Sequence, residues 1–313
     1  MGGNMKKKIF IIVAIVLVTL TGCNKTLVDG DKKRVIDEKT GQSLSANILC
    51  LPEDEEILSN YQKYEEYMDV KLSDLPKCSA MKVYDKKSYN GLWVQLFVRP
   101  LAWVIINLGK LLGNYGISVM VIGIIIRLIM MPFSAKTIKQ QESLKKAQPE
   151  LERIEKKYKD RTDQEAMMQK SQDTLAVYKK YNINPMSSCL ISFIQLPLFF
   201  AFLEAINRVP AIFENSFWKF QLGTTPLVGI KEGNYYYIIL IVLIVLFTAL
   251  SFKMTMSQTS VTTESGIQSK YMMIFMTVFI GIASIQLPSA IALYWVVTNA
   301  FNVFQTILFK KVG

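Results

Sequence analysis

The sequence predicts an all-α protein that crosses a membrane several times, and two observations lead to this fold class. Hydrophobic residues make up 51% of the 313 residues, and the mean hydropathy is +0.26. These residues gather in blocks long enough to cross a bilayer, which takes about 20 residues of helix. A soluble domain of this length is less apolar, and its apolar residues are scattered.

The composition also limits the chemistry. Histidine, the commonest general base near neutral pH and the commonest metal ligand, is absent. The four cysteines have no metal-finger spacing; they are Cys23, Cys50, Cys78 and Cys189. We therefore expect no enzyme, no catalytic residue, no metal site and no cofactor. The formal net charge of +11 says less than the location of the charges.

The first residues are typical of a secretory signal peptide, expected over residues 1–22. Lysines 6–8 precede an apolar run from Ile9 to Leu20. The end of this run, Leu20-Thr-Gly-Cys23, resembles a bacterial lipobox. That resemblance implies cleavage before Cys23 and a diacylglycerol group on its sulfur, whose two acyl chains would anchor the chain stably. The alternative is an uncleaved signal anchor.

Residues 23–90 are expected to form an extracytoplasmic region. Between Asn24 and Asn90 the chain carries 11 Lys/Arg and 13 Asp/Glu, so the basic excess lies elsewhere. Residues 53–68 fit one surface helix with acidic residues at its N-terminus. Cys50 and Cys78 share an oxidising compartment, which leaves open whether they pair. The pattern assigns no function to this region.

Six apolar blocks follow. The first, residues 91–112, contains Arg99-Pro100 near its middle, which is costly for a lipid-exposed span. We expect it to be an interfacial amphipathic helix. Within the remaining core, residues 113–311, the other five blocks are expected to be transmembrane helices, at about 115–133, 186–206, 235–252, 271–287 and 289–309.

Charge gives an independent test of this count. The loop 134–185 carries 12 Lys/Arg and 8 Asp/Glu, and basic loops prefer the cytoplasm. With the N-terminus outside, a single span at 115–133 places this loop inside, whereas a second span at 91–112 would place it outside. We therefore expect five spans in the bacterial cell membrane, with the C-terminus in the cytoplasm.

The loop itself is expected to be a cytoplasmic helical hairpin with a break near residues 159–162. Pro149 should kink the first helix unless it lies near a helix start. Its two helices carry narrow stripes that can pair. The stripes are Leu151, Ile154 and Tyr158 in the first helix, and Met168, Ser171, Leu175 and Tyr178 in the second. The hairpin is either a solvated connector or a basic docking site.

An ionisable residue lies inside one expected span. Arg127 follows the apolar run from Val119, and an arginine at a span centre costs about 2.5–3.5 kcal/mol. It needs a buried partner, a wet cavity, or a side chain that reaches the headgroups. Other spans carry further polar and aromatic residues that either bridge helices or line the same cavity. They are Gln195, Tyr294, Trp295, Thr298, Asn299, Asn302 and Gln305.

The chain resembles the YidC/Oxa/Alb insertases, in their five-span lipoprotein form. The resemblance covers about residues 92–311 and rests on the order and spacing of several motifs. These are Phe97-Val-Arg-Pro-Leu101, Asn114-Tyr-Gly-Ile-Ser118, Ile126-Arg127, Met131-Pro132, Tyr178-Lys-Lys-Tyr-Asn-Ile-Asn-Pro185, Ile194-Gln-Leu-Pro197, Leu287-Pro-Ser289 and Ala292-Leu-Tyr-Trp295.

This resemblance implies five helices around a hydrophilic groove that opens to the cytoplasm and to lipid. Arg127 matches the family's groove arginine, and Gln195 and Trp295 match other groove positions. Many relatives have a threonine one turn before the arginine, where this chain has Gly123. The implied activity is a membrane protein insertase and chaperone that works alone or with the Sec translocon. Implied partners are nascent membrane proteins, lipids, the ribosome and the signal recognition pathway, without specific nucleic acid binding.

Two other classes of function fit less well. A secondary transporter of a small anionic solute would show inverted repeats and helices broken at the midplane, and the two halves of this chain have no matching pattern. An intramembrane protease would need paired aspartates or a serine with a base inside the spans, and the expected spans contain neither arrangement.

Overall fold

The computed structural model describes residues 25–38, 40–84, 91–161, 163–256 and 263–312. Within these ranges, the side chains of 141, 185–196, 255–256, 263–270, 272 and 310–312 are not described. The signal peptide expected at 1–22 and the lipid attachment expected at Cys23 lie outside the described residues. The chain divides into two units. The first holds residues up to 123 together with 193–242 and 283–297, and the second holds 124–192, 243–282 and 298–313.

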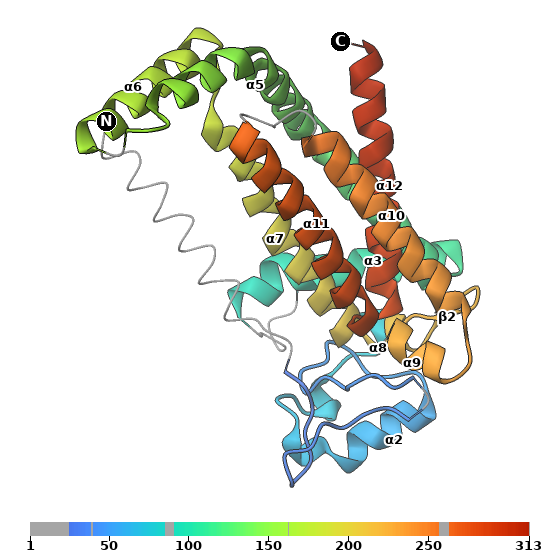
Figure 1. Ribbon diagram of the computed structural model, residues 1–313. Helices are drawn as coiled ribbons and strands as arrows, with labels where there is room; N and C mark the ends of the chain where they lie inside the picture. The colour runs from blue at the N-terminus through green and yellow to red at the C-terminus, as the bar shows by residue number, and fades with distance from the viewer. Residues whose placement is uncertain (1–24, 39, 85–90, 162, 257–262, 313) are drawn as a thin grey trace. The chain divides into compact units, whose positions relative to one another are not determined.

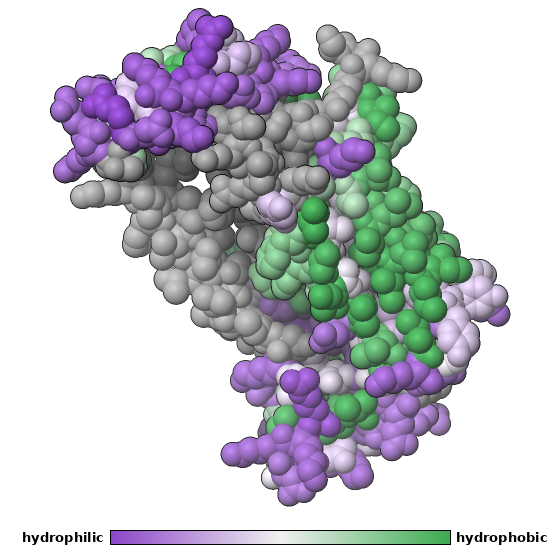
Figure 2. All heavy atoms as spheres, in the orientation of Figure 1, coloured by the Kyte–Doolittle hydropathy of each residue, from purple (hydrophilic) through white to green (hydrophobic). Residues whose placement is uncertain are grey.

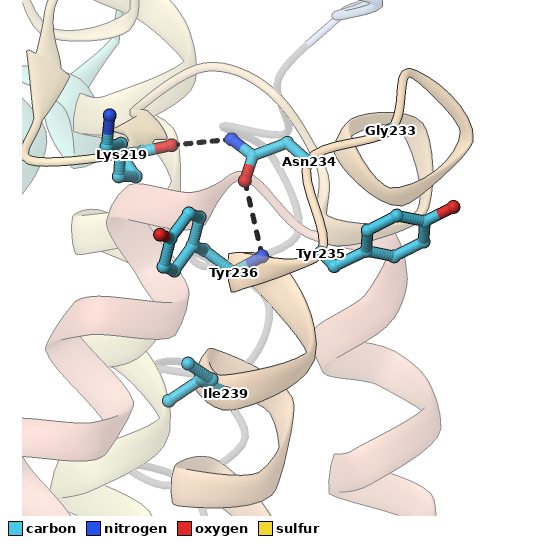
Figure 3. A pocket seen from close by; sticks show the side chains of 6 residues that line it. All are labelled: Lys219, Gly233, Asn234, Tyr235, Tyr236 and Ile239. Carbon is cyan, nitrogen blue, oxygen red and sulfur yellow. Dashed lines mark hydrogen bonds between the residues drawn. The ribbon is translucent and has the colours of Figure 1, made fainter.

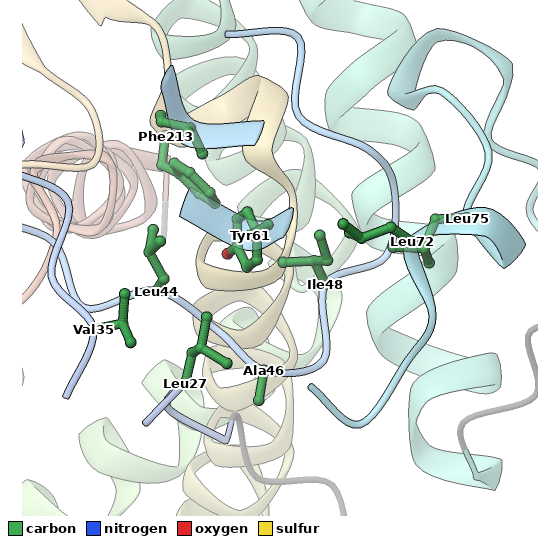
Figure 4. Packing of buried hydrophobic residues seen from close by; sticks show 10 residues of the cluster. Leu27, Val35, Leu44, Ala46, Ile48, Tyr61, Leu72, Leu75 and Phe213 are labelled. Carbon is green, nitrogen blue, oxygen red and sulfur yellow. The ribbon is translucent and has the colours of Figure 1, made fainter. Parts of the chain in front are cut away.

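The N-terminal segment of the first unit, residues 25–84, packs around a hydrophobic core to which Phe213 also contributes. Isolated bridges pair Thr26 with Ser45 and Ile36 with Ser43, and helix α2 (Glu55–Lys63) buries Ile57 and Tyr61 in the core of the segment. The carboxylate of Asp54 caps α2 by accepting the N–H groups of its first turn. Figure 4 shows the core that results, built from Leu27, Val35, Leu44, Ala46, Ile48, Ile57, Tyr61, Leu72, Leu75 and Phe213.

This segment is closed by a disulfide within it and is held to the rest of the first unit by hydrogen bonds. Cys50 and Cys78 form a disulfide, which answers the question that the sequence left open. The Leu49 N–H donates to the carbonyl of Arg208 at 2.8 Å, and the Thr224 hydroxyl donates to the carbonyl of Thr40 at 2.8 Å. The segment is therefore a packed part of the unit. The helix expected at 53–68 is shorter, because a 3₁₀ turn at Glu65–Tyr67 follows α2.

The block expected to be interfacial is one continuous helical stretch. A π-helical turn, Val94–Val98, leads into α3 (Arg99–Leu112), with Pro100 in the first turn of α3, where a missing N–H costs little. Gly113 ends α3 in the left-handed conformation, with φ of 68°. Val94–Leu112 is long and apolar enough to span a membrane, so its interfacial placement stays a prediction.

The other apolar helices lie close to the expected blocks. They are α4 (Tyr115–Ile129), α7 (Pro185–Arg208), α10 (Tyr236–Met256), α11 (Thr263–Gln286) and α12 (Ser289–Val312). Among the described residues, three helical stretches have the length and composition of a membrane span: Val94–Leu112, Tyr236–Met254 and Ser289–Phe309. The number is four if α4 and the following helix α5 form one broken span. The most hydrophobic is Tyr236–Met254, and Figure 2 shows the hydrophobic side chains gathered along α10.

Two short helices and a β-hairpin connect α7 to α10. They are α8 (Pro210–Phe213), the antiparallel strands β1 (Ser216–Phe217) and β2 (Phe220–Gln221), and α9 (Pro226–Lys231). The register pairs Phe217 with Phe220. Ser289 at the start of α12 donates its N–H and its hydroxyl to the carbonyl of Thr224, so this connection also fixes the start of α12.

In the second unit, α5 (Met131–Tyr158) and α6 (Gln164–Lys180) lie side by side (Figure 1). Their core contains Ala147, Leu151 and Val177. The stripe expected on the first helix is confirmed at Leu151, Ile154 and Tyr158. Pro149 lies inside α5, which continues on both sides of it.

The stripe expected on the second helix is wrong in phase. Met168 and Leu175 are 59% and 53% exposed, and Ser171 is exposed as well, whereas Val177 is buried and Tyr178 packs against the core. A polar contact between the two helices explains the difference. The inner face of α6 carries Asp173, whose carboxylate accepts hydrogen bonds from α5, so hydrophobicity alone points to the wrong face.

Candidate functional site

Arg127 lies in the last turn of α4, in the second unit. Its side chain is half-buried, and the neighbouring Leu128 and Ile129 are exposed. The helix breaks at Met130, and α5 begins at Met131. The arginine therefore lies two residues before the helix end, beside exposed apolar side chains.

Tyr294 and Trp295 lie one turn into α12, in the first unit. The Trp295 ring stacks on Phe199 of α7, with 5.5 Å between ring centroids and 8° between the planes. The buried Tyr294 ring stacks on Phe202 at 4.2 Å. These two stacked aromatic pairs join α12 to α7. An aromatic pair of this kind contributes about 0.5–1.5 kcal/mol beyond the burial of its surface area.

Farther along α12, in the second unit, amide side chains bond to hydroxyl groups of α10. The Asn299 amide donates to Thr248 at 3.3 Å, and the Asn302 amide donates to Ser251 at 2.6 Å. Gln305 follows one turn later, buried, with no hydrogen-bond partner for its amide among the described residues. Asn299 and Asn302 therefore join α12 to α10 through polar side chains, as is common between helices in membranes.

The structure thus brings some of the expected site residues into defined contacts and leaves others open. Tyr294 and Trp295 belong to the first unit, whereas Arg127 and Asn299 belong to the second. Gln195 lies in α7, and its side chain is outside the described ones. A groove that contains all five residues stays a prediction.

Two ion pairs join α5 to α6 in the hairpin. Lys157 and Tyr158 donate to the carboxylate of Asp173, each at 3.0 Å, and the hydrogen bond from Lys157 lowers the pKa of Asp173. Lys180 and Tyr181 donate to Glu150 in the same way, and the bond from Lys180 lowers the pKa of that carboxylate.

The hairpin surface is hydrophilic over these helices (Figure 2). The two carboxylates that face the other helix are already bonded to lysine and tyrosine, so they do little to attract further cations. The loop 134–185 has an excess of basic residues, 12 Lys/Arg against 8 Asp/Glu. Such a surface favours acidic or phosphate-bearing partners.

Sequence reasoning missed a buried polar network in the first unit. The Arg208 guanidinium donates to the Glu204 carboxylate at 3.1 Å and to the carbonyl of Asn47 at 2.8 Å. The indole N–H of Trp93 donates to the other oxygen of Glu204 at 2.8 Å. Arg208 and Glu204 are both nearly inaccessible. Their spacing of four residues on one helix was the available signal.

A second buried arginine serves the same unit. Arg99 is fully buried and donates to the carbonyl of Lys82 at 2.9 Å, while Lys110 donates to the carbonyl of Ser79 at 2.7 Å. Both bonds tie α3 to the N-terminal segment. Arg99 therefore holds a backbone carbonyl, which explains how an arginine is accommodated within this apolar stretch.

The hydrogen bonds and ring contacts described above position helices relative to neighbouring segments of their own unit. In the part of the chain that the structure describes, no three carboxylate or cysteine side chains gather as a metal site.

Comparison with known proteins gives one family. The family model described as 60Kd inner membrane protein matches residues 107–313. A membrane protein insertase YidC from Oceanobacillus iheyensis is 35% identical over 76% of this chain and 91% of the relative. The corresponding protein from Alkalihalophilus pseudofirmus is 39% identical over 69% of this chain and 81% of its own length. The insertase MisCA of Bacillus subtilis is 33% identical over 75% of this chain and 86% of its own length.

A solved structure of an active YidC insertase, with its first transmembrane domain resolved, has the same fold. It is 24% identical, with a TM-score of 0.50, and the match covers 80% of this chain and 52% of that one. The apolar helices, the matched family model and these relatives agree, and the chain therefore belongs to the YidC family of membrane protein insertases.

Proposed function

We propose that this chain inserts membrane proteins through a polar groove that opens to the cytoplasm. The groove would contain Arg127, Gln195, Tyr294, Trp295 and Asn299. The observation that carries this proposal is Arg127, a half-buried arginine in the last turn of an apolar helix. Family membership supports it, because the chain's relatives are named membrane protein insertases.

The physical reason for such a groove is the cost of moving polar groups through hydrocarbon. A substrate with a polar or acidic tail must cross the bilayer, where each unpaired polar group is expensive. A wet groove that reaches partway shortens this barrier, and Arg127 would attract an acidic tail transiently. The apolar segment then moves between helices into lipid. No covalent bond changes, so hydrophobic partitioning, aided by the membrane potential, can drive the step.

The proposed topology has five spans, formed by α4, α7, α10, α11 and α12. The N-terminus would lie outside, anchored by a lipid on Cys23 after removal of residues 1–22, and the C-terminus in the cytoplasm. The charge of the loop 134–185 supports this orientation, and the interfacial placement of 91–112 follows from it. The insertase core would be residues 113–311, with residues 23–90 outside the membrane.

The α5–α6 hairpin is the proposed docking surface on the cytoplasmic side. Its partners would be the ribosome, the signal recognition pathway, the Sec translocon or the nascent chain. Its basic excess supports electrostatic attraction of such partners, without specific recognition of nucleic acid.

An insertion assay tests the role of Arg127. Cells depleted of their own insertase would receive wild type, Arg127→Lys or Arg127→Ala, with a single-span client that has an acidic tail. Arg34→Ala is the matched control, because Arg34 is an exposed arginine in the N-terminal segment, outside the proposed groove and the α5–α6 hairpin. We expect Lys to retain insertion and Ala to lose about tenfold, since a hydrogen bond to a charged group is worth about 1.5–3 kcal/mol.

The outcomes separate function from mechanism. Restored insertion by wild type, with loss in Arg127→Ala alone, supports the electrostatic groove. Full insertion by Arg127→Ala removes this residue from the mechanism but leaves the insertase function. If wild type restores insertion of no client, the insertase function itself fails for this chain, and a transporter of anionic solutes becomes the better hypothesis.

A further inference from the structure

A recess lies in the first unit where α10 begins, and none of the expected groove residues is among the residues that line it. Its volume is about 540 Å³. It is formed by the tip of the β1–β2 hairpin, the loop after α9 and the first turn of α10 (Figure 3). The lining residues are Lys219, Gly233, Asn234, Tyr235, Tyr236 and Ile239.

Asn234 builds this recess by joining its two walls. Its side-chain amide donates to the carbonyl of Lys219 at 2.8 Å, and its side-chain oxygen accepts the N–H of Tyr236 at 3.2 Å (Figure 3). Gly233 precedes it with φ of 87°, a conformation that glycine adopts at low cost. The hairpin tip is thus fixed to the helix start, and the recess is preformed.

The recess stands at the boundary between an apolar helix and a polar loop. The helix below it, Tyr236–Met254, has the composition and length of a membrane span. The aromatic side chains of Trp218, Tyr235 and Tyr236 are all exposed at its first turn, and the Trp218 and Tyr236 rings meet edge to face at 5.0 Å. Exposed tryptophan and tyrosine at a span end are typical of the headgroup level of a bilayer.

Ile239 gives the recess an apolar wall, and Lys219 is the charged residue among those that line it. Ile239 is exposed one turn into α10, and the Lys219 ammonium points away from it (Figure 3). The neighbouring loop carries Lys231 and Glu232, both exposed, so the three charges sum to +1. The helix N-terminus adds partial positive charge. A ligand that fits has an apolar end along Ile239 and an anionic group near Lys219.

We propose that this recess binds an anionic glycerophospholipid, with its phosphate beside Lys219 and the start of an acyl chain along Ile239. The proposal depends on α10 being in the membrane and not on the insertion mechanism. The bound lipid would hold the β1–β2 hairpin and the first turn of α10 at the headgroup level.

Photo-crosslinking tests this proposal on the full chain. Tyr235, which is 68% exposed, is replaced by p-benzoylphenylalanine, and the protein is placed in nanodiscs of equal parts phosphatidylglycerol and phosphatidylcholine. Mass spectrometry then gives the ratio of the two crosslinked lipids. The variant is Lys219→Gln, and the control is Lys33→Gln, which makes the same charge change in an exposed surface pair.

We expect phosphatidylglycerol to be favoured about fivefold, falling to near parity in Lys219→Gln and unchanged in Lys33→Gln. Fivefold corresponds to about 1 kcal/mol, the usual contribution of one basic residue near an anionic surface. Parity in the wild type, or an unchanged ratio in Lys219→Gln, overturns the proposal. Loss of the lipid crosslink in excess inorganic phosphate also overturns it, because the recess would then recognise a free anion.

Discussion

Replacing Glu214 with glutamine should remove a pH dependence from the stability of the first unit. The carboxylate of Glu214 accepts the N–H of Glu53 through both oxygens, each at 3.2 Å. It therefore joins the turn after α8 to the residue just before the Asp54 cap of α2. Partial burial raises the pKa of Glu214 to about 7, against the opposing effect of the N–H donors from Glu53 and Asp54.

The sign follows from proton linkage. Between pH 4.5 and about 7 the folded chain keeps a proton on Glu214 that the unfolded chain releases. Stability from this group is therefore fully present below pH 4.5 and is lost as the pH rises through 7. The shift corresponds to at most about 3 kcal/mol. Because the side chain is only partly buried, solvent screening reduces this to about 1–2 kcal/mol.

Thermal unfolding of the purified protein in detergent measures this difference. Wild type should lose about 1–2 kcal/mol of stability between about pH 5 and about pH 8, whereas Glu214→Gln should lose that much less, because it cannot ionise. Glu56→Gln serves as the control, since Glu56 is exposed on α2. Equal losses in wild type and Glu214→Gln would refute the reasoning.

Two further experiments test the packing. Replacing both Cys50 and Cys78 with alanine opens a link between residues 28 positions apart, which should cost about 3–4 kcal/mol by chain entropy; an unchanged melting temperature under oxidising conditions would contradict this. Leu151→Ala should cost about 2–4 kcal/mol in the hairpin core, whereas Leu175→Ala should change stability by less than about 0.5 kcal/mol, because the two side chains are 4% and 53% exposed. Hydrogen exchange of the hairpin amides distinguishes them, and equal effects would show that the assigned inner face is wrong.

The boundaries of the helices were largely readable from sequence. The break expected at 159–162 lies between the end of α5 at Tyr158 and the start of α6 at Gln164, and α12 begins at Ser289 as the pattern predicts. Helix starts and ends depend on capping residues, proline and the length of apolar runs, all of which are local. The inner face of α6 could not be predicted from hydrophobicity, because the charged Asp173 lies on it and accepts a hydrogen bond from Tyr158 of α5.

The candidate site was predicted only in part. The sequence showed which residues inside the expected spans are polar. It left open whether Asn299 bridges helices or lines a cavity, and the structure gives Asn299 a hydrogen bond to Thr248. The partner of Glu204 could have been found from the spacing to Arg208. The bond from Trp93, 111 positions away, could not.

The sequence by itself determined that this is a helical membrane protein of a recognisable family, because long apolar runs and motif spacing are properties of neighbouring residues. Only the tertiary structure decided how residues 25–84 pack, that Cys50 and Cys78 join, and that Arg208 holds the carbonyl of Asn47. These contacts connect positions that are far apart along the chain, 161 positions for the bond from Arg208 to Asn47. Local periodicity contains no information about such pairs, since their energies appear only once the chain has folded.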